Sequence, residues 1–227
     1  NTTNWKSALF WQKQGIKRVN LAREMTLAHI RQVRERVSLE LEVFIHGAMC
    51  ISYSGRCLLS SILAGRSANK GECAQPCRWS YSLVEETRPN AYFPVFEGEK
   101  DTSIFNSKDL CLLEYLPDLI EAGMDALKIE GRMKGINYVA SVIRVYREAI
   151  DHYCSDPANY CVQPKWMEEL SKISHRGYTT GFLLGAPKDV DYEFDATYVR
   201  THEIVGVVEE VLDNGDILVD VRNRIVA

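Results

Sequence analysis

The sequence predicts an α/β protein: a partial TIM-like (β/α) barrel with a Cys-rich insertion, followed by the start of a small all-β C-terminal domain. Strand patterns alternate with helical patterns on both sides of an irregular middle segment. Four cysteines cluster in that segment, and the composition changes to β-branched runs near residue 190. Strands separated by helices of roughly ten or more residues favour parallel pairing, which indicates the barrel-like arrangement.

The N-terminal elements follow a strand, helix, strand order. Residues 18–22 are a short apolar strand pattern, and residues 25–36 carry apolar side chains at helical spacing. Residues 40–45 then alternate with period two, which is typical of a second strand.

A similar order returns after the middle segment. Ser107 is a good N-cap for a helix over about residues 109–121, and a strand is predicted at residues 126–129. Residues 138–153 carry one apolar stripe and predict a long amphipathic helix.

The patterns become shorter towards the C-terminus. Residues 166–173 indicate a short helix, and the β-branched runs at residues 204–211 and 217–221 are separated by an Asn-Gly pair. Such a pair between two strand patterns is typical of a β-hairpin.

These patterns predict three parts of the chain. Residues 1–154 are the C-terminal part of the barrel with its Cys-rich insertion, residues 155–189 a helical linker, and residues 190–227 the beginning of a β-barrel-like domain. The chain starts without Met and stops within a strand pattern, so we expect it to be a piece of a longer protein.

Composition and charge exclude some classes of protein. Of the 227 residues, 46% are hydrophobic and 26% are charged, which excludes a disordered or collagen-like chain. No apolar stretch reaches the roughly 18 residues that span a bilayer, so we expect a cytoplasmic protein without a membrane partner. The first 80 residues carry 12 Lys or Arg against 5 Asp or Glu, which suits an anionic partner or an ordinary solvated surface.

Four of the seven cysteines, Cys50, Cys57, Cys73 and Cys77, lie within 28 residues after the second predicted strand. In a βα barrel the loops at the carboxyl ends of strands form the functional face, so this placement suits a site. Four thiolates at one point repel each other unless a cation or a cluster neutralises them.

Three alternatives remain open for these thiols. Zinc sites usually use pairs separated by two to four residues, which fits Cys73 with Cys77 but not the six residues between Cys50 and Cys57. An iron–sulfur cubane tolerates irregular spacing between its cysteine ligands. The third alternative is disulfides or buried free thiols, and the odd number of cysteines argues against a framework made of disulfides alone. The other cysteines are interpreted as structural: Cys111 in the predicted 109–121 helix, and Cys154 and Cys161 beside a Pro-containing loop.

Several blocks together resemble the peptidase U32 family, and the resemblance covers essentially the whole chain. Relative to the family, the first part of the barrel is missing. The blocks are EVFIHGAMCISYSGRCLLS at residues 42–60, NKGECAQPCR at 69–78, KIEGR at 128–132, and HRGY at 175–178 before Gly181-Phe182.

The resemblance implies one of two activities. The family is named for a collagenase-type peptidase, whereas its better-understood branches resemble oxygen-independent hydroxylases of tRNA, rRNA or ubiquinone. The Cys-x3-Cys pair is similar to the tRNA 5-hydroxyuridine-forming branch. In that branch Cys50, Cys57, Cys73 and Cys77 would bind a [4Fe-4S] cluster, prephenate would donate the hydroxyl group, and the wobble uridine of tRNA would be the substrate.

The residues themselves give proteolysis little support. A cysteine protease needs a thiolate paired with a His, and His46 lies at a strand end where a core or capping role is at least as expected. A non-catalytic module that binds tRNA or another structured RNA is a third hypothesis.

Further substrate-binding candidates surround the cysteines in sequence. Arg132 suits a small carboxylate donor or an RNA phosphate, although Lys128, Glu130 and Arg132 could equally form internal salt bridges. For Arg56 and Arg78 three roles are open: they would compensate the charge of a cluster, bind a phosphate, or form part of a solvated basic surface. His46 is a further candidate. The resemblance also implies a substrate-side loop with His175, Arg176 and Tyr178.

Overall fold

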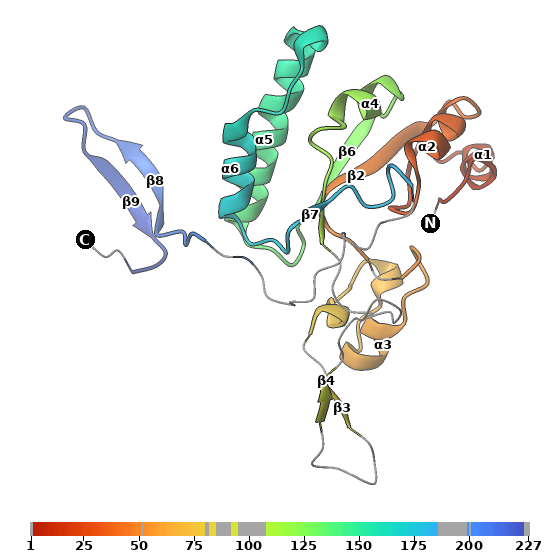
Figure 1. Ribbon diagram of the computed structural model, residues 1–227, viewed down its shortest axis with the longest axis horizontal. Helices are drawn as coiled ribbons and strands as arrows, with labels where there is room; N and C mark the ends of the chain where they lie inside the picture. The colour runs from red at the N-terminus through yellow and green to blue at the C-terminus, as the bar shows by residue number, and fades with distance from the viewer. Residues whose placement is uncertain are drawn as a thin grey trace.

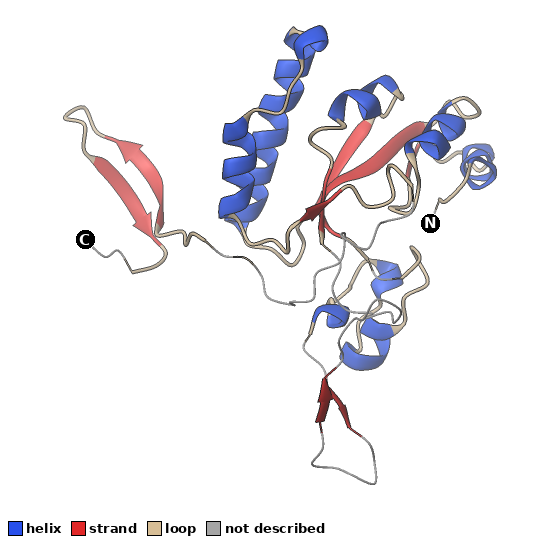
Figure 2. Ribbon diagram, viewed as in Figure 1, coloured by secondary structure: helices blue, strands red, loops and turns tan. Residues whose placement is uncertain are grey.

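The computed structural model describes residues 2–50, 52–79, 82–84, 92–94, 108–185, 199 and 201–224 (Figure 1). Its centre is a five-stranded mixed sheet that shares a hydrophobic core with the surrounding helices, and two further two-stranded sheets lie outside it (Figure 2). The predicted α/β class is therefore confirmed.

The sheet is built around β2 (Glu40–Ala48), which pairs in parallel with β1 (Arg18–Asn20) and with β6 (Ala126–Glu130). These strands confirm the three strand predictions. Two short strands complete the sheet: β5 (Asp109–Cys111), antiparallel to β2, and β7 (Tyr178–Thr179), parallel to β5.

Alternation along β2 separates a buried face from a polar face. Leu41, Val43 and Ile45 are buried, whereas Glu42 and Phe44 on the opposite face are partly exposed. The buried side chains join one core with apolar residues of the helices.

The helices begin and end at recognisable signals. Thr26 caps the second helix by accepting a hydrogen bond from the backbone N–H of His29 at 3.2 Å. The helices predicted at residues 25–36, 138–153 and 166–173 are confirmed within a few residues. The helices around the core are α1 (Trp5–Lys13), α2 (Leu27–Arg34), α4 (Leu116–Glu121), α5 (Ile136–Ser155) and α6 (Pro164–Lys172).

The helix predicted over residues 109–121 is wrong in its first part. Residues 109–111 form β5, because backbone pairing with β2 and β7 satisfies their polar groups and outweighs the local helical spacing. Pro117 then lies in the first turn of α4, where its missing N–H costs nothing. Cys111 therefore belongs to a strand, and Ser107 lies outside the described residues.

The Cys-rich insertion lies between β2 and β5 and has short elements that the sequence did not predict. Figure 1 shows the insertion beyond the carboxyl ends of β2 and β6. Its elements are α3 (Leu59–Ala64), the 3₁₀ turns η1 (Ala68–Lys70) and η2 (Pro76–Arg78), and the hairpin of β3 (Ser82–Val84) and β4 (Tyr92–Pro94).

The predicted C-terminal hairpin is confirmed as β8 (Gly206–Val211) and β9 (Ile217–Val221). Gly215, with φ +88°, takes the left-handed conformation that the connecting turn requires. Figure 1 shows this hairpin on the far side of α5 and α6 from the central sheet.

The TIM-like barrel and the three-part division at residues 1–154, 155–189 and 190–227 stay predictions. The strands in the described ranges do not close into a barrel. Within the same ranges, no helix combines the length and the apolar character needed to cross a bilayer.

Candidate functional site

The four clustered cysteines all line one cavity of about 620 Å³. The cavity lies where the carboxyl ends of β1, β2 and β6 meet the insertion, as the predicted functional face would require. Its walls also include residues from the strand ends and from the first loop of the insertion: Asn20, Arg23, Phe44, Tyr53, Lys128, Glu130 and Arg132.

A tight loop brings Cys73 and Cys77 to the cavity. The backbone N–H of Ala74 donates to Ser60 Oγ at 3.0 Å, which ties the loop to α3. Gln75 has φ +55° and donates its backbone N–H to Cys73 Sγ at 3.2 Å. This left-handed residue reverses the chain between the two thiols, and η2 begins directly after it.

Close approach of β2 to β6 places Cys50 beside the end of β6. Gly47 has φ +102°, and a Cβ atom there would lie 2.2 Å from the backbone oxygen of Glu130. Only glycine fits this position without displacing a strand. The chain leaving β2 therefore enters the insertion directly above the β6 end.

The pKa of Cys50 reflects its neighbours. Burial raises the pKa of its thiol, and the nearby Cys57 and Cys73 raise it further, while a hydrogen bond from the Ser52 backbone and the charge of Arg23 act in the opposite direction. The thiols are therefore close enough for one to disfavour the charge of another.

The donor set of the cavity consists of thiols. None of the seven cysteines forms a disulfide bond. In the described part of the chain, no three Cys, His, Asp or Glu side chains lie together closely enough to hold one metal ion. Four thiols from two loops are the kind of donor set that a [4Fe-4S] cubane uses, because each thiolate binds a different iron.

Charged side chains at the strand ends are paired across the cavity wall. Lys128 Nζ lies 3.2 Å from Glu42 Oε1. Glu130 lies between two arginines, with Oε2 at 3.3 Å from Arg23 Nη2 and 3.9 Å from Arg132 Nη2. The predicted Lys128, Glu130 and Arg132 therefore reach one cavity, but they pair with other partners as well as with each other.

Arg23 and Phe44 also line the cavity, although the sequence patterns did not identify them as site residues. The guanidinium of Arg23 lies 3.8 Å from the centroid of the Phe44 ring, and Lys128 Nζ lies 5.2 Å from the same centroid. Arg23 directly follows the first strand, so its position at a carboxyl strand end was the signal that could have identified it.

Glu24 and Tyr53 are also absent from the sequence prediction. Glu24 accepts hydrogen bonds from the backbone N–H and the hydroxyl of Ser54, the latter at 3.0 Å. Tyr53 precedes Ser54 and lines the cavity, with 68% of its surface exposed. Nothing in the local pattern distinguishes Tyr53 from a core aromatic residue.

His46 is buried instead of facing the cavity. Its side chain is fully buried, with Nδ1 3.5 Å from the hydroxyl of Tyr146. Burial lowers the pKa of His46 to about 3, and the positive charges of Lys134 and His175 contribute. The imidazole is therefore neutral at physiological pH.

The predicted loop of His175, Arg176 and Tyr178 lies with His46. The His175 and Tyr178 rings stack with centroids 4.6 Å apart, and the His46 and Tyr178 centroids are 5.4 Å apart. Arg176 is 2% exposed. We call these four residues the buried histidine group; none of them lines the cysteine cavity.

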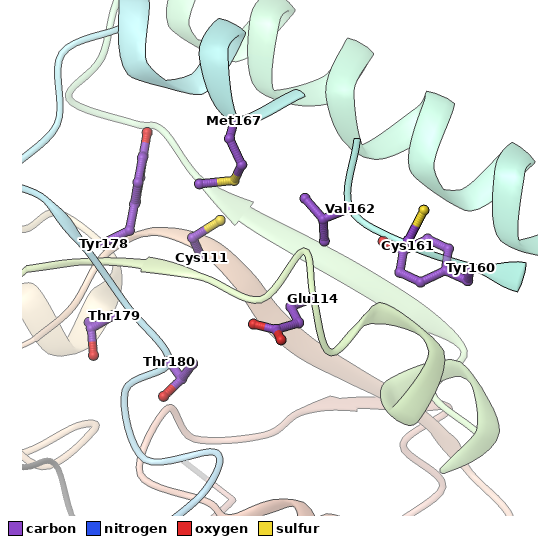
Figure 3. A pocket seen from close by; sticks show the side chains of 9 residues that line it. All are labelled: Cys111, Glu114, Tyr160, Cys161, Val162, Met167, Tyr178, Thr179 and Thr180. Atoms are coloured by element: carbon purple, nitrogen blue, oxygen red, sulfur yellow. The ribbon is translucent and has the colours of Figure 1, made fainter. Parts of the chain in front are cut away.

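A second cavity of about 750 Å³ lies between β5, β7 and the segment that leads into α6 (Figure 3). Cys111, Cys161 and Tyr178 line it, and Figure 3 shows Val162 between the two cysteines. The Tyr178 hydroxyl donates to the carbonyl of Leu170 at 2.8 Å. None of the four clustered cysteines reaches this cavity.

The two remaining predicted arginines flank the insertion. Arg56 is exposed and lies next to Cys57. The side chain of Arg78 lies outside the described residues.

Comparisons with known proteins agree on one family. Residues 1–192 match the family model for peptidase family U32. The chain is 47% identical over 208 residues to "tRNA hydroxylation protein P1" of Bacillus subtilis, covering 91% of this chain and 49% of the relative. It is 43% identical over 218 residues to an "Uncharacterized protease" of Methanocaldococcus jannaschii, covering 92% and 52%.

A third relative carries the same kind of name as the first. It is "tRNA hydroxylation protein P" of Escherichia coli. The two sequences are 35% identical over an alignment of 248 residues, gaps included, and the alignment covers 91% of this chain and 54% of the relative. The chain thus spans about half the length of these curated relatives. No solved structure matches.

Proposed function

This chain belongs to peptidase family U32, and on that premise we propose that it acts as an iron–sulfur protein in RNA modification. The proposed reaction is the oxygen-independent hydroxylation of the wobble uridine of tRNA to 5-hydroxyuridine, in the cytoplasm. The proposed cofactor is a [4Fe-4S] cluster on Cys50, Cys57, Cys73 and Cys77.

One observation carries this proposal. Four cysteine thiols from two loops line a single cavity at the carboxyl ends of parallel strands, in a chain similar to proteins named for tRNA hydroxylation. Four thiolates at one point repel one another, and a bound cluster would neutralise their charge. When bound, the cluster would supply electron transfer.

The residues around the cysteines suit a small anionic donor. Lys128 and Arg132 bring positive charge to the cavity wall, and both side chains are more than 40% exposed. Arg132 presents a planar fork that matches a carboxylate such as that of prephenate. We propose that these two residues hold the donor, that Glu42 fixes the orientation of Lys128, and that Glu130 fixes the orientation of Arg132.

We also propose that the polar face of the sheet is the interior of a partial TIM-like barrel. Glu42 and Phe44 lie on the opposite face of β2 from the buried Leu41, Val43 and Ile45, and we propose that they are interior residues of the barrel. Parallel pairing of β1, β2 and β6 supports this arrangement. A structure of the full-length protein, with the remaining strands in place, tests it.

The geometry favours peptidase activity less. A cysteine nucleophile needs a lowered thiol pKa and a nearby base, yet the pKa of Cys50 is raised. The nearest histidine in sequence, His46, is buried against Tyr146 and does not line the cavity.

The cluster and the reaction are tested together with one pair of variants. Anaerobically purified full-length protein is expected to be brown and to contain about four iron and four sulfide per chain. Cys73→Ser should lose this colour and abolish 5-hydroxyuridine in cellular tRNA, measured by mass spectrometry of nucleosides. Cys154→Ser, which changes an exposed cysteine on α5, should preserve both.

Three results would contradict the proposal. A zinc-only protein with all four thiolates bound would exclude the cluster. Persistent 5-hydroxyuridine in Cys73→Ser together with loss of peptide cleavage would favour the peptidase. A cluster-containing protein whose deletion leaves the tRNA nucleosides unchanged would favour a non-catalytic RNA-binding module.

A further inference from the structure

A tight turn at residues 53–56 stands at the rim of the cysteine cavity. The backbone N–H of Arg56 donates to the carbonyl of Tyr53 at 2.9 Å, and Gly55 has φ +76° at the third position of the turn. Cys57 follows immediately. The turn therefore has a defined shape and lies directly next to a proposed cluster ligand.

The central sheet holds this turn in place through Glu24. Both carboxylate oxygens of Glu24 accept hydrogen bonds from Ser54, one from its backbone N–H and one from its hydroxyl. Glu24 follows the β1 strand end, next to Arg23 in the cavity wall. A charged acceptor makes both bonds stronger than neutral ones, so the turn is tied to the sheet and not only to the insertion.

Tyr53 is presented by this turn instead of being packed in a core. Its side chain is 68% exposed, yet it lines the cavity that contains the four cysteines. An aromatic residue kept for packing would bury its ring. A ring that is exposed, fixed through its neighbour and placed at a cavity rim is suited to receive a flat ligand.

The surroundings of Tyr53 are positively charged. Residues 52–79 contain four Lys or Arg and one Glu. Arg56 is exposed on the same turn, and Arg66 and Lys70 are exposed further along the insertion. A polyanion that also carries flat rings, such as the unpaired part of an RNA, complements both the charge and the aromatic face.

We propose that Tyr53 is a base-stacking residue: an unpaired nucleobase of an RNA loop stacks on its ring at the mouth of the cysteine cavity. Arg56 contacts a neighbouring phosphate, and Glu24 positions the turn through Ser54. This inference rests on the proposed function because it assumes an RNA substrate. It adds the residue that receives an unpaired base of that substrate and the stacking contact that holds the base at the cavity.

The experiment measures binding of an RNA hairpin by the full-length, cluster-containing protein, with 2-aminopurine in the unpaired loop as a fluorescent reporter of stacking. Tyr53→Ala is expected to weaken binding about tenfold or more and to remove the stacking signal, because one base loses its aromatic partner. Tyr53→Phe should retain both. The cluster absorbance of each variant verifies that the site is intact.

A matched control lies in the same insertion. Ile62 on α3 is 74% exposed and does not line the cavity, so Ile62→Ala should leave hairpin binding unchanged. The slope of the logarithm of the binding constant against the logarithm of the salt concentration reports the number of phosphate contacts. Arg56→Ala should reduce this slope by about one, whereas Tyr53→Ala should leave it unchanged.

The role of Glu24 has its own readout. Glu24→Ala should reduce the 2-aminopurine signal as Tyr53→Ala does, because the turn loses its anchor. Glu24→Gln should restore it, since one amide oxygen accepts the backbone N–H and the Ser54 hydroxyl can accept from the amide nitrogen. A merely stabilising Glu24 would alter the unfolding midpoint without altering the stacking signal.

Some outcomes overturn the inference. Unchanged hairpin binding in Tyr53→Ala would remove Tyr53 from the RNA site, and an equal loss in Ile62→Ala would show that hairpin binding does not depend on the Tyr53 ring in particular. Loss of donor binding alone in Tyr53→Ala would make the residue part of the donor site. If wild-type cells lack 5-hydroxyuridine but hairpin binding depends on Tyr53, the proposed reaction fails and the stacking site stands.

Discussion

Gly47 determines how closely β2 approaches the end of β6, and through that contact where Cys50 lies. We expect Gly47→Ala to destabilise the protein by about 2–5 kcal/mol. About 1–2 kcal/mol comes from the left-handed conformation, and the rest from overlap of the new Cβ with the Glu130 carbonyl. Urea unfolding of the wild type and the variant measures this difference, and the iron content of the variant should fall with it.

Gly15→Ala provides the matched control for this prediction. Gly15 also has positive φ, +79°, but a Cβ atom there meets nothing within 4 Å. Only the conformational cost of about 1–2 kcal/mol should appear, without loss of iron. Equal effects at Gly15 and Gly47 would mean that the contact with Glu130 does not position the cysteine loop.

Among the elements, α2 is attached to the sheet by Arg34. Its guanidinium donates to the carbonyls of Val37 and Leu39 at 2.7 and 2.8 Å. It also contacts the turn before β6, donating to the Gly123 carbonyl at 3.3 Å and to Asp125 at 2.9 Å. One side chain therefore connects the end of α2 with the starts of β2 and β6.

We expect Arg34→Ala to lower the free energy of unfolding by about 2–4 kcal/mol, because several hydrogen bonds from a charged group are lost and buried carbonyls remain unpaired. Thermal and urea unfolding measure the loss. Arg36→Ala is the control, since Arg36 is more exposed, pairs with Glu35 and the Gln32 carbonyl, and lies 5.3 Å from the centroid of the Trp5 ring. It should cost less than about 1 kcal/mol. Similar losses in both variants would argue against a special role for Arg34.

The sequence predicted elements well where the pattern was long and poorly where pairing was non-local. The 16-residue stripe at residues 138–153 identified α5, because burial along one face repeats over several turns. The three residues of β5 were assigned to a helix, since their strand pairing depends on β2 and β7, which are distant in sequence.

The candidate site was predictable to a similar extent. The four cysteines were recognisable from their clustering and their place after a strand, and they share a cavity. Arg23 and Glu24 were not selected, because an Arg-Glu pair after a strand carries no specific signal in the sequence. Only the structure shows that Arg23 contacts Phe44 and Glu130 and that Glu24 binds Ser54. His46 lies in β2, the strand that precedes the cysteines, but its side chain is buried in the core, and only its three-dimensional neighbours show this.

At the scale of the whole molecule, the site candidates divide into the cysteine cavity and the buried histidine group. Tyr146 on α5 links the second group to the fold. Its hydroxyl donates to the carbonyl of Ile45 at 2.9 Å and accepts from the backbone N–H of Leu112 at 3.2 Å, joining β2 to the end of β5. His46 lies against this junction, so a charge on its ring would be placed in the core.

The stability of the whole molecule should therefore fall in mild acid because of His46. The pKa of His46 is about 3 in the folded protein and about 6.5 when unfolded, so between these values the unfolded state binds the additional proton. Stability contributed by this residue is present above pH 6.5 and is lost as the pH falls towards 3. The loss amounts to about 2 kcal/mol between pH 7 and pH 5. Urea unfolding across this range measures it.

Two variants separate His46 from the other acid-sensitive groups. His46→Asn removes the titrating ring. It should reduce the difference between the free energies of unfolding at pH 7 and pH 5 by about 2 kcal/mol, even if it lowers stability at both pH values. His29→Asn, at an exposed position on α2, should retain the wild-type slope. If His46→Asn kept the full acid sensitivity, the ring would have to reach solvent in the folded protein. The buried histidine group would then be a site open to ligands and protons, instead of the part of the core that holds β2, β5 and α5 together.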